Sequence, residues 1–298
     1  LKTLKNVLIA LIAGTAIVCI DGIAQYIIGK DLFCRHPLMH DVGLNRMTAT
    51  YRHCNDLGVY LVTVVGVIGT LALYKLKGIK RWGALAVALL IIICIALTFS
   101  RGAALGLCGA ALIIGIVRRD KLILGLMGAG LVALPFVMPG SVKAWAGSTH
   151  SFLEFFCNLD RLSFYRSAIE MIKAHPFVGV GINTFSRVYV NYKVPDVGII
   201  TPTTCYAHNN FLQMGAEIGL IGLGIFLVII TVFFFRMGKA YAQKERPEIV
   251  RIVALGVICA VAAFLLNGLT ESSFYFSKLV VLLWFMMGLG SSLIFLKE

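Results

Sequence analysis

Long apolar runs separated by short polar stretches follow one another along the whole chain. A helix needs about 20 apolar residues to cross about 30 Å of hydrocarbon, and several runs approach this length. They cover residues 4–20, 57–74, 82–117, 122–138, 211–235, 252–266 and 279–295. With two spans in 82–117, the pattern predicts an all-α fold: a polytopic transmembrane helical bundle with about eight spans in this chain.

The run 82–117 is too long for one crossing. At 1.5 Å per residue, a single helix of this length would reach roughly 54 Å. Its one internal charge is Arg101. A charge at the centre of a span costs on the order of 2.5–3.5 kcal/mol on insertion scales, so we predict that the chain turns back at Ser100-Arg101-Gly102.

A long polar segment, 139–207, interrupts the apolar pattern. The stretch from Arg161 to Ala174 carries apolar residues at helical spacing and predicts an amphipathic helix that ends before Pro176. Its predicted apolar face is Leu162, Tyr165, Ile169 and Ile172. The chain then divides into spans one to five with an outer segment at 21–56 (1–138), one large extracytoplasmic loop (139–207), and spans six to eight (208–298).

The composition supports a membrane protein. Hydrophobic residues make up 59% of the 298 residues and charged residues only 14%, with a mean hydropathy of +0.90, which is unusual for a soluble domain. The net charge of +13 does not indicate nucleic acid as a partner, because more than half of the 27 Lys and Arg fall in one alternate set of termini and short loops. By the positive-inside rule that set is cytoplasmic. The outer segment, Arg101, the long loop, His208 and Glu271 then share the opposite, periplasm-like face.

Cysteines and histidines add little. Four cysteines lie in predicted spans, and an oxidising compartment would permit disulfides among the other four, Cys34, Cys54, Cys157 and Cys205. The pair His36 and His40 has i,i+4 spacing, but Pro37 between them disfavours a helix, and we expect no metal site. Because the chain begins with Leu1, we expect it to be a fragment that lacks upstream spans.

Four side chains on the outer face could carry chemistry: Arg101, Arg161, Arg166 and His208. Guanidinium groups suit phosphate oxygens, and a histidine exchanges protons near neutral pH. Together they fit transfer of a group away from a lipid pyrophosphate. Each also has a structural interpretation: an arginine at a helical turn, at a helix start or on a solvated face, and a histidine bonded to backbone.

Further polar residues lie beside His208, at the start of an apolar run. Asn209, Asn210 and Gln213 could cap the helix or bond sugar hydroxyls. Glu217 could orient His208 or an arginine, and a structural role is equally compatible with its position at the membrane edge.

An ordered set of motifs resembles the O-antigen ligase and Wzy-type polymerase superfamily. The motifs are Ser100-Arg101-Gly102-Ala103; Arg161-Leu162-Ser163-Phe164-Tyr165-Arg166; Pro176-Phe177-Val178-Gly179-Val180-Gly181; His208-Asn209-Asn210-Phe211-Leu212; and Glu217-Ile218-Gly219-Leu220-Ile221-Gly222. Upstream, Asp21, Tyr26, Gly29, Arg46-Met47-Thr48 and the stretch from Asn55 to Leu61 also resemble it. The family often has Trp where this chain has Tyr165, so the choice between Arg161 and Arg166 stays open.

The resemblance implies a GT-C-like integral membrane glycosyltransferase of the bacterial inner (plasma) membrane, acting at the periplasmic face without a cofactor or metal. It implies an undecaprenyl-diphosphate-linked glycan as donor and a lipid A–core or other glycan as acceptor. Arg101 and Arg161 would hold the pyrophosphate, and His208 would serve catalysis. Family members usually have about a dozen spans.

The most specific expectation is an O-antigen ligase-like enzyme of surface-polysaccharide assembly, with a Wzy-type polysaccharide polymerase as the alternative. A lipid-linked sugar transporter or flippase is a further alternative. Transporters usually show paired repeats and ionisable residues near the midplane, and this sequence shows neither clearly. A structural scaffold would explain the hydrophobicity but not the Arg and His residues gathered on one face.

Overall fold

The computed structural model describes residues 1–41, 43–137, 140, 159–193 and 206–296. They belong to two compact units. The first contains 1–141, 233–267 and 276–298, and the second contains 142–232 and 268–275. Helix α10 (Asn210–Ala242) contributes its first part to the second unit and its remainder to the first.

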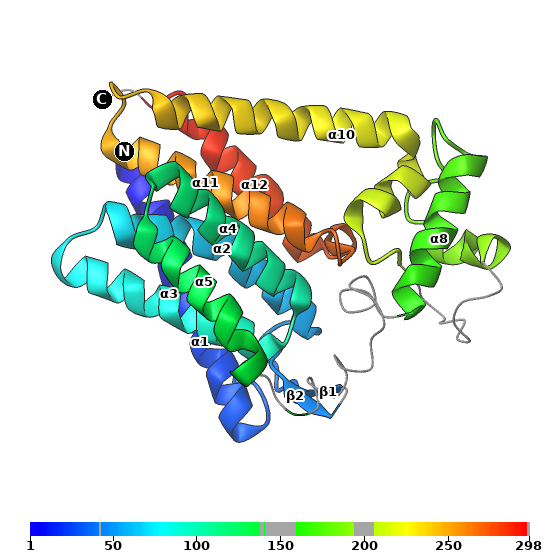
Figure 1. The fold of residues 1–298 in the computed structure, drawn as a ribbon, viewed down its shortest axis with the longest axis horizontal. Coiled ribbons are helices and arrows are strands. Elements are labelled where there is room, and N and C mark those ends of the chain that lie inside the picture. The colour runs from blue at the N-terminus through cyan, green and yellow to red at the C-terminus, as the bar shows by residue number, and fades with distance from the viewer. Residues whose placement is uncertain (42, 138–139, 141–158, 194–205, 297–298) are drawn as a thin grey trace. The chain divides into compact units, whose positions relative to one another are not determined.

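Each predicted span lies on a helix, and the polytopic helical fold is confirmed (Figure 1). Among the described residues, six helices are long and apolar enough to cross a membrane: α1 (Lys2–Ile28), α2 (Cys54–Tyr74), α3 (Gly78–Thr98), α4 (Arg101–Arg118), α10 and α11 (Glu248–Asn267). Two shorter apolar helices of 17 residues each, α5 (Lys121–Val137) and α12 (Ser277–Leu293), complete the predicted set.

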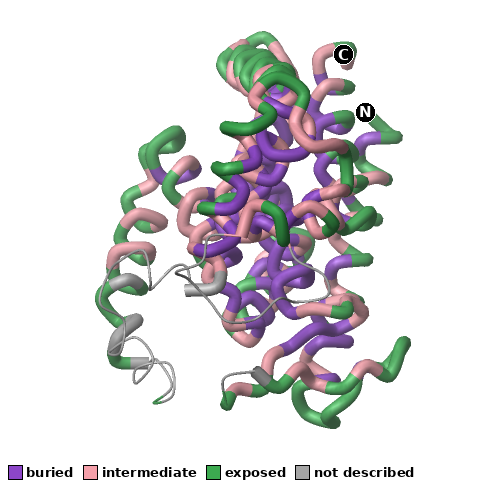
Figure 2. The backbone as a smooth tube through the Cα atoms, turned by 90° about the vertical axis from the view of Figure 1, so that its right-hand side faces the viewer, coloured by how far each residue is buried: buried purple, intermediate pink, exposed green. Residues whose placement is uncertain are grey.

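Helix α2 lies at the centre of the first unit. In its 18-residue apolar stretch, 78% of the residues are buried, and the helix packs against α3, α4 and α11. Figure 2 shows the buried residues running through the inner helices. A Cβ on Gly66 would lie 2.7 Å from the backbone nitrogen of Ala260, and one on Gly106 would lie 2.8 Å from the carbonyl oxygen of Ala263. Small residues let these helix backbones approach closely, which is how helices in membranes gain packing energy.

The first helix is longer than predicted. The sequence ended the span at residue 20, but α1 continues to Ile28 with Asp21 and Gln25 fully buried. The Gln25 amide donates to Thr48 Oγ1 at 2.8 Å and accepts from the backbone N–H groups of Thr48 and Ala49 at 2.9 and 2.8 Å. The Leu32 N–H donates to Asp21 Oδ1 at 2.7 Å. Because the returning chain binds the Gln25 amide and this oxygen, the helix continues through residues that suggested a loop.

The outer segment is anchored to the end of α3. Strands β1 (Met39–Asp41) and β2 (Leu44–Arg46) form an antiparallel hairpin. Just after it, the backbone N–H of Met47 donates to the Leu97 carbonyl at 3.0 Å. No disulfide joins Cys34, which is exposed, to Cys54, which is buried. Cys157 and Cys205 lie outside the described residues.

The predicted turn at Arg101 is confirmed. Helix α3 ends at Thr98, and Phe99 adopts a left-handed conformation with φ of 49°. Ser100 then caps α4, since its side chain accepts from the Ala103 N–H at 3.3 Å. Arg101 is the first residue of α4.

The second unit is built around α8 (Leu159–Ala174), with α9 (Phe185–Val188), η1 (Tyr189–Tyr192), the start of α10 and η2 (Ser273–Tyr275). The predicted helix is confirmed, but its predicted apolar face is only partly correct, since Ile172 packs against the core and Ile169 does not. The buried face carries Phe164, Ala168 and Met171, whereas Ile169 is 41% exposed. The partner surface of Phe185, Tyr189 and Ala216 selects the buried face, and the small Ala168 leaves room for close packing.

Candidate functional site

His208 is held at the entrance to α10 by local backbone geometry. Its φ is 47°, in the left-handed region that a residue with a side chain adopts only where the surroundings stabilise it. The next residue, Asn209, caps the helix, because its Oδ1 accepts from the N–H groups of Phe211 and Leu212 at 2.9 and 3.0 Å. The capping interpretation of Asn209 is therefore confirmed.

The turn between α11 and α12 closes over this entrance. The Asn210 N–H donates to the Gly268 carbonyl at 2.7 Å, and the Asn209 side-chain amide donates to the Leu269 carbonyl at 3.0 Å. The Tyr165 hydroxyl, from α8, reaches both the Leu269 and His208 carbonyls at 3.1 and 3.2 Å. Three stretches that are distant in sequence thus meet within the second unit.

At this meeting point three titratable side chains form a chain of contacts. Arg161 Nη2 donates to Glu271 Oε1 at 2.7 Å, and Arg161 Nη1 donates to the Thr270 carbonyl at 2.7 Å. The other carboxylate oxygen, Oε2, lies 3.4 Å from His208 Nδ1. The side chains of Arg161 and Glu271 are only 13% and 14% exposed, whereas that of His208 is 33% exposed. The imidazole is therefore the member that a substrate can reach.

The electrostatics hold Glu271 as an anion. Burial by itself would raise its pKa, but the Arg161 charge and the hydrogen bonds from His208 and Arg161 lower the pKa to about 2. A carboxylate at Nδ1 favours the tautomer with hydrogen on that nitrogen. The Nε2 atom then carries the lone pair and can accept a proton. The arrangement can orient and support a general base.

Glu217 lies in a separate, more buried network. Its oxygens accept from the backbone N–H groups of Asn183 and Phe185 at 3.0 and 2.9 Å, and from the Gln213 amide at 3.2 Å. The Tyr275 hydroxyl also donates to it, and burial and this carboxylate together raise the pKa of that hydroxyl. The residue that contacts His208 and an arginine is thus Glu271, not Glu217.

Two of the family-like motifs are joined through their backbones. The N–H groups of Val180 and Gly181 donate to the Ala216 and Glu217 carbonyls, each at 2.9 Å, and the Leu220 N–H returns to the Pro176 carbonyl at 2.7 Å. Helix α10 is interrupted between these bonds at Gly219, whose φ is 69°. A Cβ at Gly219 would collide with the Phe177 carbonyl, so the break requires glycine.

The remaining predicted residues are placed differently. Arg166 lies on the exposed side of α8, five residues after Arg161. Arg101 belongs to the first unit. Asn210 is 1% exposed, and its Oδ1 accepts from the Phe274 N–H at 3.3 Å. Of the predicted catalytic and phosphate-binding residues in the second unit, Arg161 and His208 both contact Glu271.

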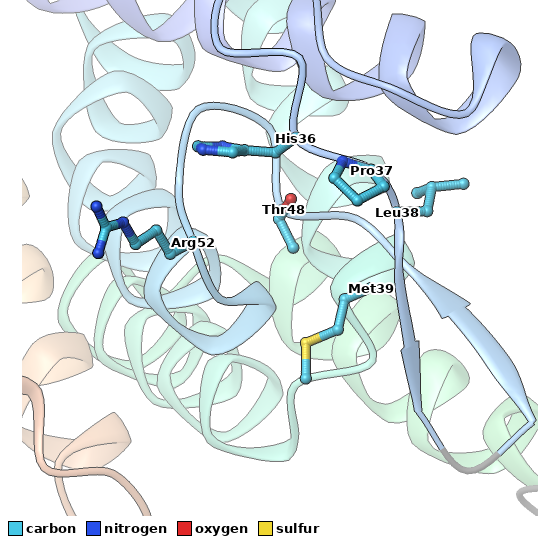
Figure 3. A pocket seen from close by; sticks show the side chains of 6 residues that line it. All are labelled: His36, Pro37, Leu38, Met39, Thr48 and Arg52. Atoms are coloured by element: carbon cyan, nitrogen blue, oxygen red, sulfur yellow. The ribbon is translucent and has the colours of Figure 1, made fainter.

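His36 and His40 of the outer segment have separate partners. His36 Nδ1 lies 3.6 Å from the buried Asp31 carboxylate, and His40 Nδ1 lies 2.6 Å from Asn45 Oδ1. In the described part of the chain, no group of three metal-ligating side chains is found. A surface cavity of about 340 Å³ opens in this segment (Figure 3). It is lined by His36, Pro37, Leu38, Met39, Thr48 and Arg52.

The site residue that sequence reasoning did not single out is Glu271. It is the one acidic residue in the short polar turn between the last two spans, on the same predicted face as His208. An acidic residue isolated between two apolar runs was a usable signal. Its pairing with Arg161, 110 positions earlier, was not visible in the pattern.

These features define a multi-pass helical membrane protein with a His–Glu–Arg cluster at the start of a spanning helix. Residues 85–227 match the family model described as O-antigen ligase, a range that includes Arg101, Arg161 and His208. The match confirms the resemblance to the O-antigen ligase and Wzy-type polymerase superfamily that the motifs predict.

A curated relative gives a second comparison. The exopolysaccharide production protein ExoQ of Rhizobium meliloti (strain 1021) is 26% identical over 141 residues. The alignment covers 45% of this chain and 31% of the relative, so this chain matches about a third of the relative's length.

Proposed function

We propose that this protein is a membrane glycosyltransferase that moves a glycan from undecaprenyl diphosphate to an acceptor hydroxyl at the periplasmic face, as an O-antigen ligase does. The observation that carries the proposal is the contact of His208 with Glu271, which Arg161 holds as an anion. This cluster lies in a chain whose family match includes both His208 and Arg161. The charge distribution of the loops supports the periplasmic orientation.

In the proposed reaction, His208 Nε2 takes the proton of the acceptor hydroxyl. The acceptor oxygen forms a bond to the anomeric carbon of the glycan, and the bond from that carbon to the diphosphate oxygen breaks. The electron pair leaves with the polyprenyl diphosphate. Glu271 stabilises the imidazolium that forms, in the way that a buried carboxylate supports a catalytic histidine.

The arginines are proposed to balance the charge of the leaving group. Guanidinium groups bind phosphate oxygens in a bidentate manner and stay charged throughout. Arg161 is partnered by Glu271 and the Thr270 carbonyl, so it would contribute its positive field while it orients the carboxylate. Arg166, on the exposed side of α8, is proposed as a direct diphosphate ligand. The proposed phosphate-binding role of Arg101 rests on the family resemblance alone. No metal is needed in this scheme.

The amides and Glu217 take positioning roles in this proposal. Asn209 caps α10 beside His208, and Asn210 ties the same helix to the turn that carries Glu271. Glu217 orders the chain around Asn183 and Phe185. A lipid A–core saccharide is the proposed acceptor, and the bacterial inner membrane is the proposed location.

A Wzy-type polymerase is the second candidate, and one observation favours it. The relative ExoQ is named for exopolysaccharide production, which requires that sugar units be joined into a polymer. Both candidates use the same donor chemistry and differ in the acceptor. Cells lacking the gene would contain finished but unattached polymer if the protein is a ligase, and single repeat units if it is a polymerase.

The test uses the full-length protein in lipid nanodiscs with a polyprenyl-diphosphate glycan and candidate acceptors. Released polyprenyl diphosphate is measured. We expect His208→Gln to lower turnover by about 10²- to 10⁴-fold, the usual contribution of a general base. His40→Gln, a histidine of the outer hairpin, is the matched control and should keep its rate. Full activity of His208→Gln would overturn the mechanism, and sugar transport without cleavage would favour a flippase.

A further inference from the structure

Residues 176–182 form an exposed apolar segment beside the break in α10. Phe177, Val178 and Ile182 are 69%, 74% and 78% exposed, among the most exposed large apolar residues in the described part of the second unit. No charged residue occurs from Pro176 to Ser186. A soluble loop would not normally expose three large apolar side chains so close together.

The segment is locked to the start of the spanning part of α10. The Leu220 N–H donates to the Pro176 carbonyl at 2.7 Å, and the Ile221 N–H to the Phe177 carbonyl at 3.4 Å. Leu220 and Ile221 are themselves 50% and 55% exposed. The apolar surface of the segment is therefore continuous with the exposed apolar face of a helix that is long enough to cross the membrane.

The backbone of the segment is suited to a water-poor environment. Irregular backbone is tolerated at membrane depth only where its polar groups find partners. The N–H groups of Gly179, Val180 and Gly181 donate to the carbonyls of His175, Ala216 and Glu217 at 3.1, 2.9 and 2.9 Å. The carbonyls of Pro176 and Phe177 accept the two N–H groups that the break in α10 leaves without a helical partner.

The flanking residues are of the kind found at a membrane surface. Lys173 precedes the segment and ion-pairs with Glu170 at 2.7 Å, and His175 Nε2 contacts the Tyr192 hydroxyl at 3.0 Å. Lysine and tyrosine are typical of the boundary between acyl chains and headgroups, where each keeps a polar end in water.

We propose that residues 176–182 insert into the membrane leaflet on the side of the candidate site, and that Phe177, Val178 and Ile182 contact lipid acyl chains beside Leu220 and Ile221. The occupant of this apolar surface is the bilayer itself. The segment then anchors the large loop in the membrane close to the start of α10. This inference goes beyond the proposed transfer reaction and does not depend on it.

The test measures depth and requires no turnover. Spin labels are placed by Phe177→Cys, Val178→Cys and Ile182→Cys in the full-length protein in nanodiscs, after Cys34→Ser, Cys157→Ser and Cys205→Ser, and the residual background signal is subtracted. Collision rates with oxygen, which is concentrated in lipid, are compared with those of a water-soluble nickel chelate. Ile225→Cys in α10, where the side chain is 59% exposed, is the lipid reference. Glu170→Cys, on the exposed side of α8, is the water reference.

We expect the ratio of oxygen to nickel collisions at positions 177, 178 and 182 to match that at 225 and to exceed that at 170 several-fold. Ratios equal to that at 170 would overturn the proposal by placing the segment in water. Low collision rates with both reagents would also overturn it, because they would show that protein, such as a second copy of the chain, covers the surface. Retained gel-filtration behaviour of each labelled variant verifies that it is folded.

Discussion

Two carboxylates in the described part of the second unit, the mostly buried Glu271 and the buried Glu217, have opposite surroundings. Glu271 contacts the Arg161 guanidinium and the His208 imidazole, and that imidazole is partly exposed. Glu217 contacts two backbone amides, a side-chain amide and a tyrosine hydroxyl. A carboxylate that binds backbone amides fixes the course of the chain, whereas one that binds a cation and a histidine can support proton transfer. The partners of a carboxylate, more than its burial, distinguish a structural role from a chemical one.

The largest expected effect comes from removing the cation of the Glu271 cluster. Arg161→Ala leaves a buried carboxylate without its charged partner, which typically costs about 3–5 kcal/mol. We expect a fall of this size in the free energy of unfolding, measured by denaturant titration in detergent. The double variant Arg161→Met with Glu271→Gln removes both charges and should recover most of the loss. If the double variant is as unstable as the single one, the ion pair is not the cause.

Replacing each carboxylate by its amide should have different effects on turnover and on hydrogen exchange. Glu271→Gln removes the charge behind His208, and we expect turnover to fall by about 10²-fold, the lower end of a general-base contribution. Glu217→Gln should lower turnover much less. It should instead accelerate hydrogen exchange at the amides of Asn183 and Phe185, because a lost buried bond costs about 1–3 kcal/mol. Equal loss of turnover in both variants would contradict the division of roles.

The break that follows Glu217 should be sensitive to a single methyl group. Gly219→Ala places a Cβ at φ of 69° and against the Phe177 carbonyl, so we expect a cost of at least about 1–2 kcal/mol. Gly224→Ala, five residues later in the same helix, meets no atom within 4 Å and should gain up to about 1 kcal/mol. Thermal unfolding of the two variants should shift in opposite directions. A shift of the same sign would show that the break is not required.

A further expected effect concerns pH. The folded-state pKa of Glu271 is lowered from 4.5 to about 2, so its ionisation stabilises the folded protein above about pH 4.5, and this contribution is lost as the pH falls towards 2. The wild-type protein should therefore lose stability across this range more steeply than Glu271→Gln does. Unfolding temperatures measured at a series of pH values test this, and parallel curves for the two proteins would contradict it.

The sequence predicted the parts of this fold that depend on solvation. The apolar runs located the helices, and the cost of burying Arg101 located the turn between α3 and α4. It misjudged α1 at Asp21 and Gln25, because the groups that bind one Asp21 oxygen and the Gln25 amide come from the returning chain. It placed the buried face of α8 only partly correctly, since periodicity shows that a helix has faces but not which neighbours will cover them.

The candidate site also has features that the sequence predicted and features that depend on tertiary structure. His208 and the arginines were predicted from residue type and predicted topology, and Asn209 from helix-capping chemistry. The pairing of Arg161 with Glu271 depends on tertiary structure between residues 110 positions apart. The break at Gly219 was also hidden, because an apolar run containing a glycine resembles a continuous span.

The separation of Arg161 from Glu271 has a consequence for biogenesis. The chain is made from its N-terminus, so α8 and His208 leave the ribosome well before the turn that carries Glu271. Until that turn has been made, neither Arg161 nor the imidazole can contact the Glu271 carboxylate. The cluster is therefore completed late in synthesis, and a nascent chain that stops after α10 contains His208 without the partner that orients it.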